Sequence, residues 1–262
     1  LVDGDVFSAY RASPEAIAEY RAKLGIRPTD FIIGKVARPV LEKWSDLLID
    51  MVPYLVKEVS HAKIIIIGCP PSRIKRINRS RYKDFFRILP ETDDQRALHL
   101  FYQTIDVLAH SSKIGECNGN TINEAMFWKK PVVVNSTQRK DNGKLEQVIH
   151  RVNAIVANTP PTFARALASL AVDPVVRAKM GQAGFDQVKK VNDPRFITKQ
   201  LEKVFIEKMD EKSDLISLPM VSEYATVPYY PSETAIVQYQ QEYHTRLGCE
   251  FGRISNGERF YS

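Results

Sequence analysis

The chain has 262 residues, 44% of them apolar, and a formal net charge of +6 at pH 7. This length and composition predict a large globular domain with a hydrophobic core, and so small a charge gives no indication of nucleic acid as a partner. No apolar run approaches the roughly 18 residues of a membrane span. The start does not resemble a signal peptide, because Asp3 and Asp5 interrupt it. Three scattered cysteines form neither a disulfide framework nor a zinc motif, so we expect a cytoplasmic location, where thiols stay reduced.

Six short apolar runs, taken in chain order, predict β-strands at residues 31–34, 64–67, 85–89, 107–109, 132–134 and 154–156. Amphipathic segments between and after them predict helices at residues 40–55, 97–105, 121–127, 145–149, 162–170, 175–191 and 195–209. Strands that alternate with helices at this spacing indicate an α/β fold with a doubly wound, parallel, six-stranded Rossmann-like sheet.

We expect three parts along the chain. Residues 1–29 form a leading segment with a helix, residues 30–212 hold the sheet, and residues 213–262 form a C-terminal extension. Prolines and tyrosines punctuate this extension, which carries one expected helix near residues 234–245 and otherwise gives no clear indication of its fold.

Basic residues crowd the connection between the second and third predicted strands. They are Arg73, Lys75, Arg76, Arg79, Arg81 and Lys83. We interpret this segment as a solvated turn, and peripheral contact with an anionic membrane surface is the alternative.

The most informative feature is a pair of glutamates, Glu116 and Glu124, on either side of a polar loop that opens a predicted helix. The loop consists of Asn118, Gly119, Asn120 and Thr121. Unpaired backbone N–H groups at a helix N-terminus favour an anion such as phosphate, and Gly119 allows close approach of the backbone. Glu124 can accept hydrogen bonds from ribose hydroxyls, and Glu116 can reach hydroxyls of a sugar. A single carboxylate here would only complement the helix dipole, whereas two around such a loop indicate a sugar-nucleotide site.

Arg38 and Lys43 follow the first predicted strand, about one helical turn apart. Ligands of open α/β sheets bind beyond the carboxyl ends of the strands, so this guanidinium and ammonium could hold the two phosphates of a diphosphate. Taken alone, such a pair is more often ordinary surface charge. His110, at the end of the fourth strand, is expected on the same side, where a hydrogen-bonding role in the pocket wall and a chemical role stay equally open.

These residues resemble a known family. The spacing of Glu116 and Glu124, with Ala125-Met126 and Pro131-Val132-Val133 behind them, resembles the signature of retaining glycosyltransferases of family 4, also called glycosyl transferases group 1. The resemblance is to their C-terminal, donor-binding domain, which is one half of the two-Rossmann-domain (GT-B) architecture. It covers roughly residues 1–205, and residues 2–7 are similar to the interdomain hinge of that family.

The resemblance implies binding of a nucleotide-diphosphate sugar, without a cofactor or metal, for transfer with retained configuration. It implies catalytic roles for Arg38, Lys43 and Glu116. It also implies donor-binding roles for Gly34, Leu89, Pro90, Asn118, Gly119, Asn120, Thr121 and Glu124. The acceptor would be bound by an N-terminal domain or a partner subunit outside this chain, so the chain alone is expected to be inactive. The base, the sugar and the acceptor stay open. The identity of the donor does not carry over from the family, because Cys117-Asn118-Gly119 and Asn123 depart from its pattern in the sugar pocket.

Two other functions remain open at this point. One is a non-catalytic partner subunit that binds a sugar nucleotide, and the other is a sugar-nucleotide epimerase, which the paired glutamates make the weaker alternative. The sequence has neither the glycine-rich motif of nicotinamide enzymes nor the phosphate-binding loop of nucleotide hydrolases. Asp3-Gly4-Asp5 precedes the first strand, so we do not interpret it as a metal site.

Overall fold

The computed structural model describes residues 2–137, 141–191 and 193–210 of the chain. At its centre lies a six-stranded parallel sheet with the strand order β3-β2-β1-β4-β6-β8. These strands are β1 (Phe31–Val36), β2 (Ala62–Ile67), β3 (Phe86–Leu89), β4 (Val107–His110), β6 (Val132–Val134) and β8 (Ala154–Val156). The order runs outward from β1 in both directions, as in Rossmann-like folds, and confirms the predicted doubly wound sheet. The switch in direction falls between β1 and β4.

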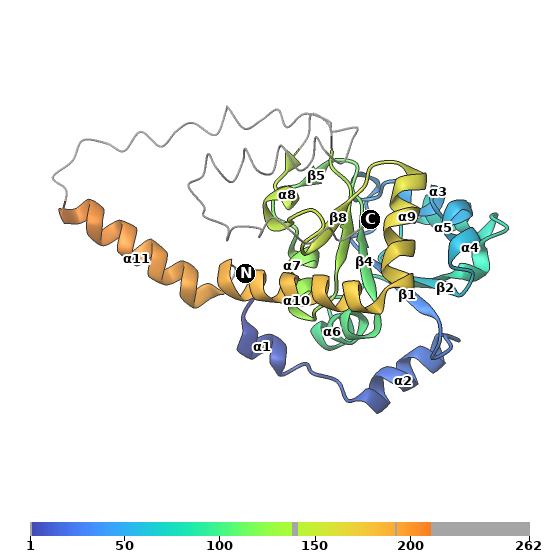
Figure 1. Ribbon diagram of the computed structural model, residues 1–262, viewed down its shortest axis with the longest axis horizontal. Helices are drawn as coiled ribbons and strands as arrows, with labels where there is room; N and C mark the ends of the chain where they lie inside the picture. The colour runs from blue at the N-terminus through green and yellow to red at the C-terminus, as the bar shows by residue number, and fades with distance from the viewer. Residues whose placement is uncertain (1, 138–140, 192, 211–262) are drawn as a thin grey trace.

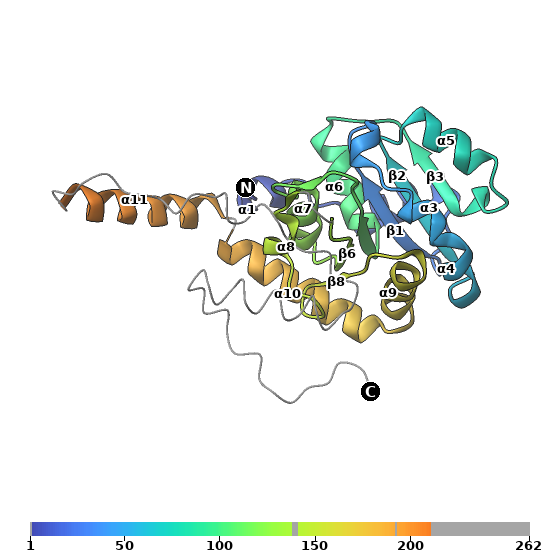
Figure 2. The same ribbon diagram turned by 90° about the horizontal axis from the view of Figure 1, so that it is seen from above.

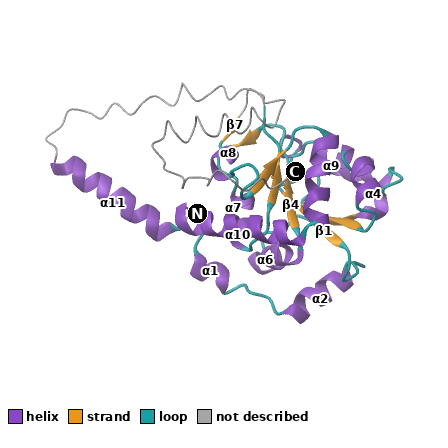
Figure 3. Cartoon of the chain, viewed as in Figure 1, coloured by secondary structure: helices purple, strands orange, loops and turns teal. Residues whose placement is uncertain are grey.

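Helices cover both faces of the sheet (Figures 1 and 3). One face carries α3 (Leu47–Asp50), α4 (Val52–Glu58) and α9 (Pro160–Val172), and the other carries α6 (Gln95–Thr104), α7 (Asn120–Phe127) and the short α8 (Lys144–Gln147). Helix α10 (Pro174–Val191) packs against both α7 and α9. Because each face is covered, the central strands are buried on both sides, which their β-branched residues suit.

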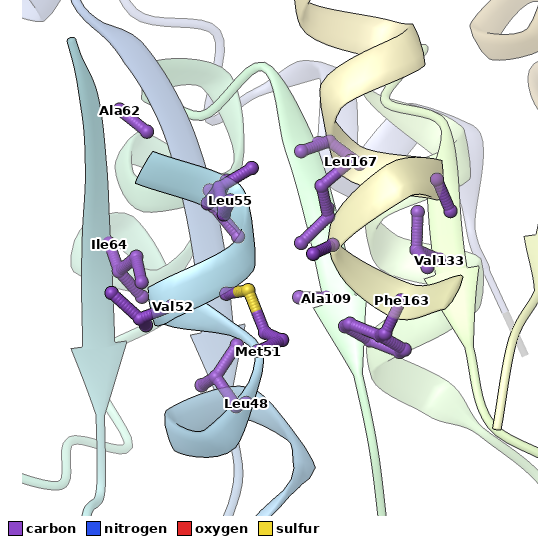
Figure 4. Packing of buried hydrophobic residues seen from close by; sticks show 14 of the residues in the cluster. Leu48, Met51, Val52, Leu55, Ala62, Ile64, Ala109, Val133, Phe163 and Leu167 are labelled. Atoms are coloured by element: carbon purple, nitrogen blue, oxygen red, sulfur yellow. The ribbon is translucent and has the colours of Figure 1, made fainter. Parts of the chain in front are cut away.

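The core on the α4 and α9 face shows how the sheet is held between helices (Figure 4). Leu55 of α4 and Leu167 of α9 face Ile64 of β2 and Val133 of β6, and all four are at most 1% exposed. Phe163 is fully buried beside them. Complete burial of each such side chain stabilises the fold by about 1.5–3 kcal/mol relative to exposure.

The prediction of one continuous helix over residues 40–55 was wrong, because this segment consists of several shorter elements. It consists of a 3₁₀ turn, η1 (Leu41–Lys43), followed by α3 and α4. Trp44 between them has an extended backbone (φ −121°, ψ 109°), and Pro53 lies in the first turn of α4, where a missing N–H is tolerated. The indole N–H of Trp44 donates to the carbonyl of Arg38 at 2.9 Å and folds this loop back over the end of β1.

The basic connection is a helix and not the expected turn. Helix α5 (Pro71–Asn78) begins at a proline, and Arg73 and Arg76 both pair with Asp46 at 2.8 Å. Arg76 also pairs with Asp50. Two of the six cations are therefore neutralised by carboxylates beside α3. The 3₁₀ turn η2 (Lys83–Phe85) then leads into β3.

The leading and trailing helices lie outside the two-faced sheet. In Figure 1, α2 (Pro14–Lys23) lies below α6 and α1 (Gly4–Ser8) lies to its left. Helix α11 (Pro194–Asp210) extends away from the sheet in both views (Figures 1 and 2). The predicted C-terminal extension, residues 213–262, and the helix expected in it near residues 234–245 lie outside the described residues. No helix in the described part of the chain has the length and apolar character needed to cross a membrane.

Candidate functional site

Two loops meet at the carboxyl edge of the sheet, where the strand order switches. The β1 loop (residues 37–46) carries Lys43, and the β4 loop (residues 111–119) carries Glu116. The Lys43 ammonium and the Glu116 carboxylate are 2.8 Å apart, although 73 positions separate them in the chain. Both side chains are largely buried, with 22% and 16% exposed. This ion pair joins the two loops whose residues the sequence predicted for the site.

The backbone also joins these loops. The carbonyl of Glu42 accepts hydrogen bonds from the amides of Lys113 and Ile114, at 3.1 and 3.3 Å. Glu116 belongs to β5 (Gly115–Glu116), which pairs with β7 (Asp141–Asn142) in a separate two-stranded parallel sheet. Neither short strand was predicted. Their pairing holds the backbone of Glu116, and the ion pair with Lys43 holds its carboxylate.

His110, the last residue of β4, lies between the two glutamate-bearing segments. Its Nε2 is 3.7 Å from Glu116 Oε1, and its Nδ1 is 3.2 Å from Thr121 Oγ1 at the start of α7. Burial holds the pKa of His110 well below its usual range, and the charges of Lys35, Lys144 and Lys43 lower it further. The imidazole is therefore neutral at physiological pH, and its contact with Thr121 favours the hydrogen-bonding role of the two that the sequence left open.

Acid should destabilise the protein partly through His110. The unfolded chain gains a proton at His110 near pH 6.5 while the folded chain does not, so the stability contributed by the neutral imidazole is present above that pH and lost as the pH falls below it. One such group changes the free energy of unfolding by up to about 1.4 kcal/mol per pH unit. Urea unfolding at several pH values between 7.5 and 5 measures how the free energy of unfolding changes with pH. This change should be smaller for His110→Gln than for the wild type. The exposed His61→Gln is the matched control, and equal slopes in all three proteins would contradict the assignment.

The polar loop before α7 is held by one glutamine. The amide of Gly119 donates to Gln147 Oε1 at 3.2 Å, and Gln147 Nε2 donates to Asn118 Oδ1. The Asn120 amide donates to the carbonyl of Asn118 at 3.0 Å. Helix α7 begins at Asn120, as the motif predicted, and Thr121 in its first turn contacts His110. The loop residues Asn118 to Thr121 are thereby linked to Glu116 through the imidazole.

Glu124 turns to the α6 side of α7. Its carboxylate accepts a hydrogen bond of 2.6 Å from the hydroxyl of Tyr102. Burial raises the pKa of Glu124, and the hydrogen bond from Tyr102 lowers it again in part. In the described part of the chain, the hydrogen bond of Glu124 goes to Tyr102 and not to the Lys43–Glu116 pair. Its expected contact with ribose hydroxyls stays a prediction.

The other predicted site residues are distributed along the sheet. Arg38 lies in the β1 loop with its side chain exposed. Leu89 ends β3 and Pro90 follows it, and the carbonyl of Leu89 accepts from the Gly68 amide at 3.3 Å. All three lie at the carboxyl edge, with β3 two strands away from β1.

The structure does not bring Gly34 to this group. Gly34 lies inside β1, and a Cβ there would come within 2.7 Å of side-chain atoms of Ile105 and Phe101. The glycine is required because α6 packs closely on the strand at this point. This packing role is the physical reason for its residue type.

Sequence reasoning missed a group of buried polar residues near the two loops. Lys35 and Lys144 are at most 1% exposed. Asn135 Oδ1 accepts from the Ser112 amide and from Lys144 Nζ, both at 3.1 Å. One signal was available, since Lys35 interrupts an otherwise apolar strand and a charge in such a position is rare without a partner. Among the described residues, no cluster of three or more histidine, cysteine, aspartate or glutamate side chains could hold a metal.

Comparison with known proteins identifies the family. The sequence pattern of the family described as Glycosyl transferases group 1 matches residues 16–187, which is more than half of the chain. The chain therefore belongs to the glycosyl transferases group 1 family. Comparison with curated protein sequences gives no match.

Solved structures share the fold. HepE from Anabaena, in complex with UDP-glucose, superposes with a TM-score of 0.66 at 23% identity, over 79% of this chain and 56% of that chain. A glycosyltransferase from Rickettsia africae gives a TM-score of 0.66 at 17% identity, over 81% and 56%. The C-terminal domain of a group 1 glycosyl transferase (LpcC) from Francisella tularensis gives 0.61 at 20% identity, over 74% of this chain and 100% of that domain. The chain thus spans about half the length of the first two proteins and has the fold of the C-terminal domain of the third.

Proposed function

We propose that this chain is the donor-binding half of a retaining glycosyltransferase that uses a nucleotide-diphosphate sugar. The observation that carries the proposal is the ion pair between Lys43 and Glu116, placed at the carboxyl edge of the sheet beside the N-terminus of α7. Family membership supports transfer of a sugar, and HepE, which shares the fold, is in complex with UDP-glucose. A uridine diphosphate sugar is accordingly the first donor to test.

In this proposal the cations stabilise the leaving group. Transfer through an oxocarbenium-like transition state leaves a diphosphate whose negative charge grows as the bond to the sugar breaks. The exposed guanidinium of Arg38 and the ammonium of Lys43 would bind the diphosphate from the β1 loop, and the amides near Asn120 would bind it from α7. Each preorganised donor of this kind typically contributes about 2.7–4 kcal/mol to transition-state stabilisation. These groups would take the part that a metal ion takes in other transferases.

The carboxylates would orient the donor. Glu116, held by Lys43 and close to His110, would accept hydrogen bonds from hydroxyls of the transferred sugar. Glu124 would bind the ribose, and Leu89 and Pro90 would border the base. Binding and orientation are thereby divided between two loops and the edge of β3.

The acceptor would be held by a second domain, N-terminal in the natural protein or on a partner. Helix α11 extends away from the sheet and exposes Leu201, Val204 and Phe205 at spacings that place them on one helical face. Their exposed fractions are 51%, 50% and 64%. An apolar face of this kind is what a second domain covers. We expect no sugar transfer by the 262-residue chain alone, and turnover by it would contradict this division of labour.

Calorimetric titration with UDP, GDP and ADP, in the presence of EDTA, tests the donor site. We expect one of the three nucleotides to bind without metal, and its base is then the base of the donor. Glu116→Gln should weaken binding of the corresponding nucleotide sugar by about tenfold, because hydrogen bonds to a charged group contribute about 1.5–3 kcal/mol each. Glu146→Gln, at an exposed glutamate of α8, is the matched control. A chain that binds none of the nucleotides has no complete donor site.

A further inference from the structure

Lys35 is a lysine inside the central strand of the sheet. It lies in β1 between β2 and β4, it is 1% exposed, and its Nζ donates to the carbonyl of Ser111 at 2.9 Å. The ammonium also lies 5.3 Å from the centre of the Trp44 ring, within the range of a cation–π contact. None of the roles proposed for the donor site involves Lys35.

These two contacts join the loops of the candidate site. Ser111 begins the β4 loop that carries Glu116, and Trp44 belongs to the β1 loop that carries Arg38 and Lys43. Because side chains alternate along a strand, Lys35 shares the face of β1 that Phe31 and Ile33 present to the core around Trp44. It is the last of this row, at the carboxyl edge. Its ammonium therefore contacts both loops from within the sheet.

We propose that Lys35 is a positioning residue for donor binding, which holds the β1 and β4 loops in register and adds a buried positive charge beside the Lys43–Glu116 pair. The inference rests on the proposed donor site. It extends that proposal to a residue that the motif does not contain. It also explains why an otherwise apolar strand tolerates a charged side chain at its end.

The charges around Lys35 make its protonation sensitive to a bound anion. Burial lowers the pKa of Lys35 to about 8, Glu116 raises it in part, and Lys43 lowers it. Cys69 also faces it, with a thiol whose pKa burial raises to about 11, and the charge of Lys35 is one of those that lower the pKa of His110. A diphosphate at the two loops adds negative charge, which favours the protonated ammonium. Near pH 8, binding of a nucleoside diphosphate should therefore be accompanied by uptake of up to about half a proton.

The experiment is calorimetric titration of the chain with UDP at pH 8, in Tris and in HEPES, whose ionisation enthalpies differ. The difference between the two observed enthalpies gives the protons taken up. We expect uptake by the wild type, loss of this uptake in Lys35→Met, and affinity about tenfold weaker in that variant. Lys35→Arg keeps the charge but does not titrate near pH 8. It should lose the uptake while retaining more of the affinity than Lys35→Met.

Lys63→Met is the matched control. Lys63 lies in the neighbouring strand β2, its Nζ is 5.3 Å from the centre of the Phe85 ring, and it donates to the carbonyl of Asp84 at 3.2 Å. It makes the same two kinds of contact away from the two loops. Lys63→Met should bind UDP with the affinity and the proton uptake of the wild type. Losses seen in Lys35→Met but not in Lys63→Met are then due to the position of Lys35 and not to the removal of a lysine from the sheet.

The outcomes separate this inference from the donor site itself. Binding of UDP by the wild type without proton uptake, or equal affinity and uptake in Lys35→Met, would overturn the role of Lys35 and leave the donor site intact. Absence of binding of UDP, GDP and ADP by the wild type would remove the donor site and the role of Lys35 with it. Thermal unfolding shows whether each variant is folded. If Lys35→Met does not fold, the uptake by the wild type and its loss in Lys35→Arg decide the question.

Discussion

Replacing Lys43 with methionine is expected to weaken binding of UDP by about 10- to 100-fold, because a charge-assisted contact to a phosphate contributes about 1.5–3 kcal/mol. The substitution has a second effect of the same sign. It leaves the Glu116 carboxylate, 16% exposed, without the ammonium that is 2.8 Å away, and an uncompensated carboxylate repels the incoming diphosphate. Calorimetric titration of folded Lys43→Met with UDP measures the loss directly.

The control for this prediction is Lys57→Met, at an exposed lysine of α4. It removes one unit of charge from the chain without touching either loop. Raising the salt concentration should weaken binding to the wild type and to Lys57→Met by the same factor, and should affect Lys43→Met less, since one of the charges that attract the diphosphate is gone. Equal affinity of the two variants would show that Lys43 does not contact the ligand.

The second large effect concerns stability. Gly68→Ala is expected to lower the free energy of unfolding by about 2–5 kcal/mol, the sum of about 1–2 kcal/mol for a left-handed backbone and about 1–3 kcal/mol for overpacking. Gly68, which follows β2, has a φ of +75°, and a Cβ there would lie 2.1 Å from the carbonyl oxygen of Ala37. A backbone atom cannot move aside as a side chain can. Urea unfolding measures the cost.

Gly25→Ala separates the two causes of that cost. Gly25 has a similar φ of +63°, but a Cβ there would meet only the Nη2 atom of Arg87, at an ordinary 3.8 Å. This variant should lose about 1–2 kcal/mol, the backbone component alone. A loss in Gly68→Ala no larger than in Gly25→Ala would show that the β1 loop moves freely at Ala37. Because Arg38 is the next residue, such freedom would also argue against a preorganised diphosphate site.

Much of the fold could be predicted because its signals are local. Runs such as 64–67 and 132–134 are apolar and β-branched, and the amphipathic segments between strands repeat with the helical period. The errors fell where a local pattern competes with packing. The apolar stripe across residues 40–55 fits a single helix, but the indole of Trp44 bonds to the backbone of Arg38 and breaks it. The two short strands that hold Glu116 were missed because two residues carry no periodic signal.

The local structure around the motif was also predicted, whereas the roles of its residues stay predictions. The expected helix over 121–127 is α7, which begins one residue earlier, at Asn120. The sequence could not show that Glu124 bonds to Tyr102 or that Gln147 holds the loop, because both partners come from other elements. A glutamate one turn into a helix can turn to either neighbour, and only the packing of α6 against α7 selects one.

The sequence by itself determined the class of fold, the chain order of the six strands of the main sheet, and the residue types that belong to the glycosyl transferases group 1 family, because alternation, periodicity and motif spacing are all properties of neighbouring residues. Tertiary structure alone decided the pairing of Lys43 with Glu116, the packing of Gly34 under α6 and the burial of Lys35. Each of these depends on which strands become neighbours. In a parallel sheet, strands far apart in the chain end at one edge, and their loops meet there.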